Sequence, residues 1–328
     1  MIKPYFETEN GKLFHGCCLE IMKDIPTGSI DLIFADPPYN ISKAEWDKID
    51  NYHEWCLEWI TACCKVLKPN GAFWVSHSVP EELALISMMI KEKGRARINW
   101  ITWDKYNGNH SQKGFLDGYT ILEANRSFHQ MAEYLIYHAD EGEWSSQCDK
   151  ERGFIFEPIR EYLSSEFKRA GVKYEKANEF CNTASMAGHH YFTKSQWCLP
   201  TKEHYKKLQK GLNKNGGEYL RREYEDLRRE YEDLRYTFNN PGKTSSIWPI
   251  PPESGWHPTT KPKNLMRRII NSTSNPGDLV FEPFGGSMPG GRVAHETGRR
   301  WMATEKKLSY CEKAKKQFKR ETRQLTIT

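Results

Sequence analysis

Residues 30–39 read Ile-Asp-Leu-Ile-Phe-Ala-Asp-Pro-Pro-Tyr, and this stretch decides how the rest of the chain is interpreted. The apolar run at 30–35 is the kind of segment that forms a strand, and it stops at two consecutive prolines. We therefore expect a buried strand that is followed by a rigid loop at 36–39.

The groups on this loop suit one kind of chemistry. An exocyclic amine on a nucleobase is a poor nucleophile, because its lone pair is delocalised into the ring. The Asp36 carboxylate and the Pro37 carbonyl can accept its two hydrogens and free the lone pair, and Pro38 restricts the direction of that carbonyl. Tyr39 offers a face on which a base can stack. A plain strand–loop junction is the alternative for the tetrapeptide taken alone.

Three downstream segments give the tetrapeptide a context. They are His-Pro-Thr-Thr-Lys-Pro at 257–262, Phe-Glu-Pro-Phe-Gly-Gly-Ser at 281–287 and Gly-Arg-Arg-Trp-Met-Ala-Thr-Glu at 298–305. Together with residues 36–39, this set resembles the amino-methyltransferases that act on DNA and use S-adenosylmethionine. The order, with the tetrapeptide first and the glycine-rich loop last, is similar to that of the subgroup called β.

Strands alternate with helices over both flanks of the chain. Strands are expected at 12–15, 30–35, 72–75, 97–104, 131–138, 279–281 and 300–304, and helices at 18–25, 51–67, 80–93 and 263–273, with a turn at 68–71. This alternation predicts an α/β fold with a mainly parallel, doubly wound sheet, and the resemblance implies a Rossmann-like methyltransferase. We expect a discontinuous catalytic domain at 1–142 and 243–328 with an inserted, mostly helical domain at 143–242.

The insertion is polar and helix-rich, with helices expected at 159–169, 174–181 and 201–210. Between them, 187–197 mixes aromatic, amide and cationic side chains, which is the mixture that reads base edges and holds phosphates. The short helices are compatible with a helix-turn-helix-like unit. The resemblance implies target recognition for the region as a whole, and a helical insertion that braces the fold is the alternative.

Two further segments have open interpretations. Residues 222–228 recur unchanged at 229–235, which places Tyr224, Leu227, Tyr231 and Leu234 on one helical stripe. We interpret this as an amphipathic helix packed on its own domain, with a dimer contact or a spacer arm as alternatives. Residues 105–130 form a long connection that either touches nucleic acid or is a solvated surface loop.

The resemblance implies a cofactor site on the C-terminal side. Glu282 suits the ammonium group of the cofactor, the glycines after Phe284 permit close backbone approach, and a carboxylate at 305 can hold two ribose hydroxyls. At 257–262, polar capping of a helix N-terminus is the plainer explanation. The implied cofactor contacts are Cys17, Asp36, Thr259, Lys261, Glu282, Pro283, Phe284, Gly285, Gly286, Ser287 and Glu305.

Three positions depart from the family pattern. Cys17 stands where an aspartate usually accepts from the adenine of the cofactor, Met288 stands where glycine is usual, and Pro289 removes a backbone donor. Losing such an acceptor costs about 1–3 kcal/mol, so we expect weakened cofactor binding. Calorimetry that gave sub-micromolar affinity would contradict this expectation.

The bulk composition excludes several classes of protein. The nine cysteines include no C-x-x-C pair, so neither a disulfide framework nor a metal site is expected, and a reducing compartment is indicated. The chain starts without an apolar signal segment and has no run of membrane-spanning length, so we expect a cytoplasmic protein with no membrane partner. The net charge of +5 is compatible with a polyanionic partner.

From the resemblance we expect methylation of N6 of an adenine that is flipped out of double-stranded DNA. Aspartate at 36, where serine is more common in the cytosine group, favours adenine over N4 of cytosine. A catalytically impaired DNA-binding homologue is the other alternative. Restriction–modification with a cognate endonuclease, replication-linked marking and phage self-protection all remain open, as does a homodimer.

Overall fold

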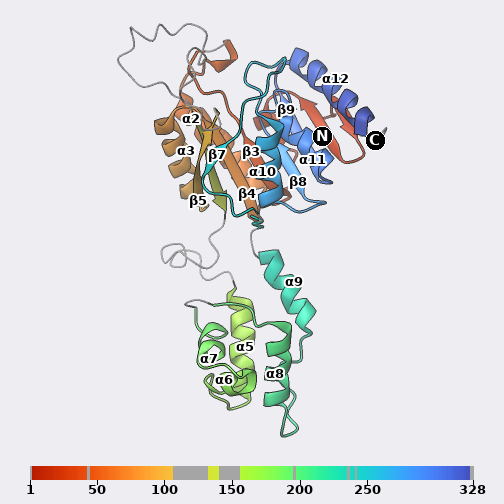
Figure 1. Ribbon diagram of the computed structural model, residues 1–328. Helices are drawn as coiled ribbons and strands as arrows, with labels where there is room; N and C mark the ends of the chain where they lie inside the picture. Colours follow the sequence, from red (N-terminus) through yellow and green to blue (C-terminus); the bar gives the residue numbers. More distant parts are fainter. Residues whose placement is uncertain are drawn as a thin grey trace. The chain divides into compact units, whose positions relative to one another are not determined.

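The structure is a computed structural model that describes residues 2–42, 45–105, 132–139, 156–194, 197–234, 237–240 and 242–325. The chain divides into two compact units (Figure 1). Met1–Asp140 and Thr237–Thr328 form the first, which we call the sheet unit, and Glu141–Tyr236 forms the second, which we call the helical unit.

The sheet unit is built on one mixed sheet with nine described strands in the order β1-β2-β9-β8-β3-β4-β6-β5-β7. These are β1 (Phe6–Thr8), β2 (Gly11–His15), β3 (Ile30–Ala35), β4 (Leu67–His77), β5 (Ala96–Asp104), β6 (Ala132–Ala139), β7 (Ile247–Pro249), β8 (Leu279–Glu282) and β9 (Arg300–Glu305). The pairs from β2 through β9, β8 and β3 to β4 are parallel, whereas β6 runs antiparallel to both β4 and β5. The predicted α/β class with a mainly parallel sheet is confirmed.

Helices cover both faces of this sheet, as a strand that is apolar on both sides requires. On one face, α1 (Cys18–Met22), α2 (Tyr52–Val66) and α3 (Pro80–Glu92) bury their apolar stripes against Ile33 and Phe73. On the other lie α10 (Lys263–Thr273), α11 (Pro289–Glu296) and α12 (Leu308–Leu325). There the Trp74 indole donates to Thr273 of α10 over 2.9 Å.

The central parallel strands bring distant parts of the sequence to one edge of the sheet. Strand β3 ends at Ala35, β8 ends at Glu282 and β9 ends at Glu305. Because these strands are parallel neighbours, the loops that follow them emerge side by side. The tetrapeptide and the glycine-rich loop therefore meet, although about 250 residues separate them.

The turn predicted at 68–71 is wrong, because these residues lie within β4. The pairing with β3 jumps here, since Ile30 faces Leu67 but Leu32 faces Ala72. The turn-forming residues thus make a bulge in a continuing strand. The buried Arg95 guanidinium stabilises it by donating to the carbonyls of Lys68 and Pro69 over 2.7 and 2.6 Å.

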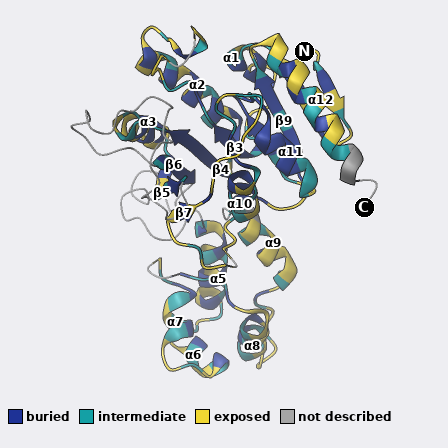
Figure 2. Cartoon of the chain, turned by 45° about the horizontal axis from the view of Figure 1, so that its top comes forward, coloured by how far each residue is buried: buried dark blue, intermediate teal, exposed yellow. Residues whose placement is uncertain are grey.

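The helical unit has its own apolar core. Its helices are α5 (Glu157–Arg169), α6 (Lys176–Cys181), α7 (Met186–His190), α8 (Lys202–Leu212) and α9 (Tyr224–Leu234). Figure 2 shows buried residues on the inner sides of α5 and α8 and exposed residues on their outer sides. Phe167, Leu208 and Leu227 are fully buried in this core, so the unit has the interior of a separate domain.

The repeated segment packs on the helical unit, as interpreted. Leu227 of α9 is buried, and Tyr224, Tyr231 and Leu234 pack against the same core. The four residues of the predicted stripe thus share one interior. The alternatives of a dimer contact or a spacer arm are not needed to explain the heptad.

The aromatic residues of 187–197 do not form the base-reading surface that was expected. Tyr191, Phe192 and Trp197 are buried in the core, where Phe192 stacks on Tyr174 with ring centroids 4.6 Å apart. Large aromatic side chains gain most by leaving water, which explains their placement. His189 remains exposed, and 195–196 lie outside the described residues.

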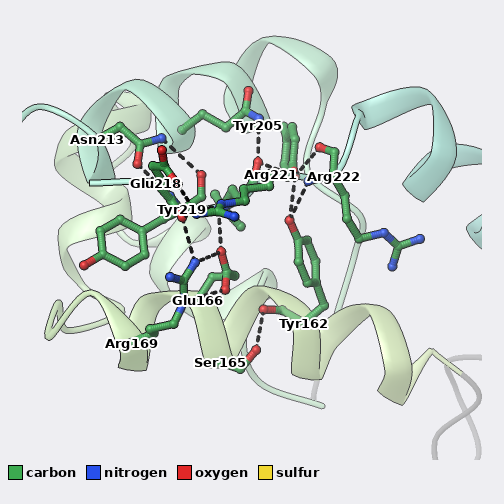
Figure 3. A network of polar contacts seen from close by, with 12 residues as sticks. Tyr162, Ser165, Glu166, Arg169, Tyr205, Asn213, Glu218, Tyr219, Arg221 and Arg222 are labelled. Atoms are coloured by element: carbon green, nitrogen blue, oxygen red, sulfur yellow. Dashed lines mark hydrogen bonds and ion pairs between the residues drawn. The ribbon is translucent and has the colours of Figure 1, made fainter. Parts of the chain in front are cut away.

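Polar groups of the helical unit hold its own backbone (Figure 3). The Glu166 carboxylate of α5 accepts from the Leu220 amide over 2.6 Å and from the Arg169 guanidinium over 2.8 Å. The Tyr162 hydroxyl accepts from the Arg222 amide over 3.1 Å. The segment that precedes α9 is thereby fixed to α5.

No helix in the described ranges is long and apolar enough to cross a membrane. The expected loop at 105–130 lies outside the described residues except for Lys105, which directly follows β5.

Candidate active site

A cavity of about 890 Å³ lies in the sheet unit at the ends of β2, β3, β8 and β9. It is lined from the β3 side by 36–39 and from the β8 side by 282–287. The structure brings all the predicted catalytic and cofactor residues to its wall: Cys17, Asp36, Pro37, Pro38, Tyr39, Thr259, Lys261, Glu282, Pro283, Phe284, Gly285, Gly286, Ser287 and Glu305.

Asp36 is held by three side chains. Its Oδ1 accepts from Ser76 Oγ at 2.5 Å, from Lys261 Nζ at 2.7 Å and from the Tyr39 hydroxyl at 2.9 Å. Its Oδ2 accepts from Lys261 Nζ at 2.7 Å. An ionised carboxylate has about four acceptor positions, so Oδ1 is fully used and Oδ2 keeps one position for a further donor.

Lys261 belongs to a chain of alternating charges. Its ammonium lies 3.4 Å from Glu133 Oε2, and Glu133 Oε1 lies 2.5 Å from Lys105 Nζ. Burial works against ionisation of Glu133, but the two lysines outweigh it and lower its pKa to about 2. Burial likewise opposes the charge of Lys261, and Asp36 and Glu133 reverse that effect and raise its pKa. Both groups are therefore ionised at neutral pH.

Tyr39 is half-buried and lines the cavity. One face of its ring packs on His77, with centroids 4.3 Å apart. Its hydroxyl is bonded to Asp36, and burial, followed by the charges of Asp36 and Glu133, raises its pKa. The phenol is thus neutral, and a planar group can stack only on the face away from His77.

A hydrogen-bond chain holds the Pro38 carbonyl. The Val79 amide donates to His77 Nδ1 over 3.0 Å, so the proton of this ring is on Nε2, which lies 3.1 Å from the Tyr52 hydroxyl. Burial lowers the pKa of His77 to about 4, so the ring is neutral. Tyr52 in turn donates to the Pro38 carbonyl over 2.8 Å. Within the described residues, the Pro37 carbonyl has no donor and stays available to a ligand.

Glu282 holds the first turn of α11. Its two oxygens accept from the amides of Gly290 and Gly291 over 2.9 and 2.7 Å, which satisfies donors that a helix N-terminus leaves free. A Cβ at residue 290 would lie 2.7 Å from the Glu282 carboxyl carbon, so glycine is needed for this approach. Burial raises the pKa of Glu282 to about 7.

Met288 and Pro289 are both accommodated in this loop. Met288 is buried and adopts φ +54°, a left-handed conformation that glycine takes at less steric cost. Pro289 is the first residue of α11, where an amide has no partner within the helix in any case. The expected loss of a backbone donor at 289 therefore has no consequence for the helix.

Glu305 braces the glycine loop from β9. Its carboxylate accepts from the amides of Gly286 and Lys307 over 2.9 and 2.7 Å, and burial raises its pKa. Gly286 has φ +52°, and a Cβ on Gly285 would lie 3.0 Å from the Thr304 carbonyl oxygen. The two glycines are required by the shape of this loop.

Cys17 lies at the start of α1 and lines the cavity. A hydrogen bond from the Cys18 thiol is the main reason that its pKa is lowered to about 5, and backbone amides of Leu19 and Glu20 add to the effect. Burial alone would work in the opposite direction. The lowered pKa favours the thiolate, which is a better acceptor than the thiol considered from the sequence.

Several residues in and around the cavity were not predicted from the sequence. Ser76 contacts Asp36 and Glu133 contacts Tyr39. Glu133 could have been singled out from the sequence, because it is an acidic residue inside the apolar strand β6. In the segment that follows the tetrapeptide, Asp47 is 1% exposed and accepts from the amides of Asn40 and Ile41. Its neighbour Trp46 lines the cavity.

Lys261 has a partner that the sequence did not indicate. Its ammonium donates to both oxygens of Asp36, and the residue also lines the cavity in which the resemblance implies a cofactor contact. Within the described residues, no cluster of His, Cys, Asp or Glu has the arrangement of a metal site.

Comparisons with known proteins identify the family that this chain matches and several of its relatives. The sequence model of a DNA methylase family, N6_N4_Mtase, matches residues 30–316. The chain is 25% identical over 336 residues to the type II methyltransferase M2.LlaDCHI of Lactococcus lactis subsp. cremoris, covering 97% of this chain and 93% of that protein. It is 27% identical over 312 residues to the DNA adenine methyltransferase YhdJ of Escherichia coli K12, covering 93% and 81%.

Solved structures share the fold. PvuII DNA methyltransferase, which is cytosine-N4-specific, superimposes with a TM-score of 0.55 at 18% identity and covers 95% of this chain and 88% of that one. The complex of M1.HpyAVI with S-adenosylmethionine gives a TM-score of 0.51 at 19% identity, covering 94% and 99%.

Proposed function

The chain belongs to the N6_N4_Mtase family of DNA methylases, and from that premise we propose that it methylates N6 of an adenine in double-stranded DNA with S-adenosylmethionine as methyl donor. One observation carries the proposal. Asp36 Oδ2 and the Pro37 carbonyl both retain acceptor capacity, and both line the cavity that the glycine-rich loop also lines.

The residues of the glycine-rich side fit this cofactor. S-adenosylmethionine supplies a methyl group on a positively charged sulfur, together with an ammonium, two ribose hydroxyls and an adenine amino group. Glu282 and Glu305 each have acceptor positions beyond the two backbone amides that they hold, and the Cys17 thiolate is a third acceptor. Gly285 packs closely on β9, which holds the loop against the strand, and both Gly285 and Gly286 line the cavity.

The tetrapeptide would bind and align the target amine. Asp36 and the Pro37 carbonyl each accept one N–H, which draws the amine nitrogen toward a tetrahedral geometry. Tyr39 offers the face opposite His77 to the base. As the nitrogen took the methyl group, the bond between that carbon and the sulfur would break, and the sulfur would leave as a neutral thioether. Asp36 need not remove a proton first, because the proton would pass to water after positive charge has developed on nitrogen. Alignment and fixed charges supply most of the acceleration in sites of this kind.

Adenine is the proposed base, and N4 of cytosine is the second candidate. The amine geometry is the same for both, and relatives of this chain include an adenine enzyme and a cytosine-N4-specific one. Aspartate at 36 favours adenine. The hypothesis of an impaired binder loses much of its basis, since Met288 and Pro289 are accommodated and Cys17 retains an acceptor.

A base inside a duplex cannot reach this cavity, so we propose that the target rotates out of the helix. We also propose that the helical unit recognises the DNA target. Its α8 carries Lys206 and Lys210 on the exposed side, one turn apart, and neither makes an ion pair within the described residues. Lys214 continues this lysine face just past the helix. Cations in such a row suit a phosphate backbone.

Labelled S-adenosylmethionine and DNA, followed by digestion to nucleosides, test the proposal. We expect the label in N6-methyladenine. Label in N4-methylcytosine would overturn the assignment of the base. Specific DNA retention without incorporation would support the impaired binder instead.

A further inference from the structure

Asp36 forms a buried ion pair with Lys261. Lys261 is 3% exposed, and its Nζ contacts both Asp36 oxygens at 2.7 Å. The Asp36 side chain is 18% exposed, against 4% for the Lys261 side chain. Both residues line the cavity, and the lysine is the more deeply buried partner of the pair.

If Asp36 were paired only with the buried Lys261, the pair would stabilise the methyl transfer poorly. An amine becomes positively charged as it takes the methyl group, and a neutral Asp36–Lys261 pair would give that charge little stabilisation. Glu133 changes this balance, because its carboxylate lies 3.4 Å from the same ammonium and is itself 9% exposed. The buried trio Asp36–Lys261–Glu133 carries a net charge of −1, from two carboxylates and one ammonium.

Tyr39 ties the two carboxylates together. Its hydroxyl lies 2.9 Å from Asp36 Oδ1 and 3.3 Å from Glu133 Oε2, and it also accepts from Lys261 Nζ over 3.1 Å. Lys105 contacts the far oxygen of Glu133, and its side chain is 27% exposed, so solvent screens this outer charge more than the inner three.

We propose that Lys261 and Glu133 are positioning residues for the reaction. Lys261 fixes the Asp36 carboxylate so that the remaining acceptor position of Oδ2 faces the target amine. Glu133 balances the charge of Lys261, so that Asp36 keeps its negative charge for the amine. This inference rests on the proposed methyl transfer and adds two residues that touch neither the amine nor the methyl group.

The test compares four variants with the wild type. Glu133→Gln removes one charge and keeps the shape, Lys261→Met removes the ammonium, and Lys261→Arg keeps a cation. Lys68→Met is the matched control, because Lys68 makes a similar ion pair with Asp31 on the same sheet, at 2.5 Å, away from the cavity. Single-turnover methylation, calorimetric Kd for S-adenosylmethionine and the melting temperature are measured for each.

A positioning role predicts a loss in rate that stability does not explain. Glu133→Gln should lower the single-turnover rate by about 10- to 100-fold with a cofactor Kd within about twofold of the wild type. Lys261→Met should lower it further, and Lys261→Arg should recover part of the loss. Lys68→Met should lower the melting temperature and leave the rate within about twofold.

The outcomes separate this inference from the function on which it rests. An active wild type with Glu133→Gln at the wild-type rate overturns the positioning role alone. An equal loss of rate in Lys68→Met and in Glu133→Gln overturns it as well. A wild type that transfers no methyl group overturns the proposed function, and the positioning role falls with it. If Lys261→Met does not fold, the near-isosteric Glu133→Gln still decides the question.

Discussion

The sheet unit and the helical unit use polar residues in opposite ways. In the sheet unit, Asp36 is held by neighbouring side chains and still has an acceptor position left for a ligand. In the helical unit, Glu166 and Tyr162 are engaged by backbone amides of the segment before α9 (Figure 3). Unused hydrogen-bonding capacity, and not polar composition, therefore marks the site.

The two units also differ in what they leave on the surface. The sheet unit gathers its spare acceptors in one cavity, whereas the helical unit offers the exposed lysine face Lys206, Lys210 and Lys214. This division suits a chemical step in one unit and contact with a charged polymer in the other. The following changes test whether the two roles can be separated.

The largest expected effect is the loss of the helical core. Phe167→Ala removes a fully buried ring and should destabilise that unit by about 3–5 kcal/mol. DNA retention should be lost, while the calorimetric Kd for S-adenosylmethionine stays within about twofold of the wild type, because the cavity belongs to the sheet unit. A large change in that Kd would mean that cofactor binding also depends on the helical unit.

The next largest effect is the pH dependence of the cofactor Kd that Glu282 should cause. The pKa of this residue is raised to about 7, so its carboxylate is mostly protonated at pH 6 and ionised at pH 8. If it binds the ammonium of the cofactor, the Kd falls as pH rises through 7, by about tenfold between pH 6 and 8. Calorimetry at both pH values measures this change.

Glu282→Gln supplies the control for that prediction. The amide does not titrate, so its Kd should show little change over this interval and should be about tenfold higher than that of the wild type at pH 8. A variant that kept the wild-type pH dependence would assign the titration to another group.

A smaller effect is expected from the lysine face. Each phosphate contact contributes about 0.9 to the slope of log affinity against log salt, so the double variant Lys206→Ala/Lys210→Ala should lower that slope by about 2. The single-turnover rate at saturating DNA should not change. The matched control is Lys316→Ala/Arg320→Ala on the exposed side of α12, and an equal loss of slope there would remove the special role of α8.

The smallest effect is expected at Cys17. Since its pKa is lowered to about 5, the thiolate can accept a hydrogen bond at neutral pH. Cys17→Asp should therefore change the cofactor Kd by less than about threefold, whereas Cys17→Ala should raise it by about tenfold. A hundredfold lower Kd in Cys17→Asp would instead mean that Cys17 weakens cofactor binding in the wild type, as the sequence suggested.

The sequence predicted the parts of the fold that local patterns determine. The apolar run before Asp36 and the glycines after Phe284 identified two parallel strands and their loops, and both loops line one cavity. The sequence could not show that Lys261 contacts Asp36, because that pairing depends on the register of β3 against β8 and on the path of the chain into α10.

Two wrong expectations have a common physical reason. The turn signal at 68–71 became a bulge in β4 because Arg95, from a distant part of the chain, satisfies its carbonyls. The aromatic residues of 187–197 became core because neighbouring helices supplied a place to bury them. In both cases tertiary contacts decided between alternatives that local sequence left equal.

The most direct measurement is methyl transfer by Asp36→Ala under single-turnover conditions, together with its cofactor Kd. If Asp36 holds the target amine in the cavity that it shares with the glycine-rich loop, transfer falls by at least about a thousandfold while the Kd stays within about threefold of the wild type. Purified Asp36→Ala that still methylated DNA at a comparable rate would contradict this role of Asp36 and the mechanism built on it.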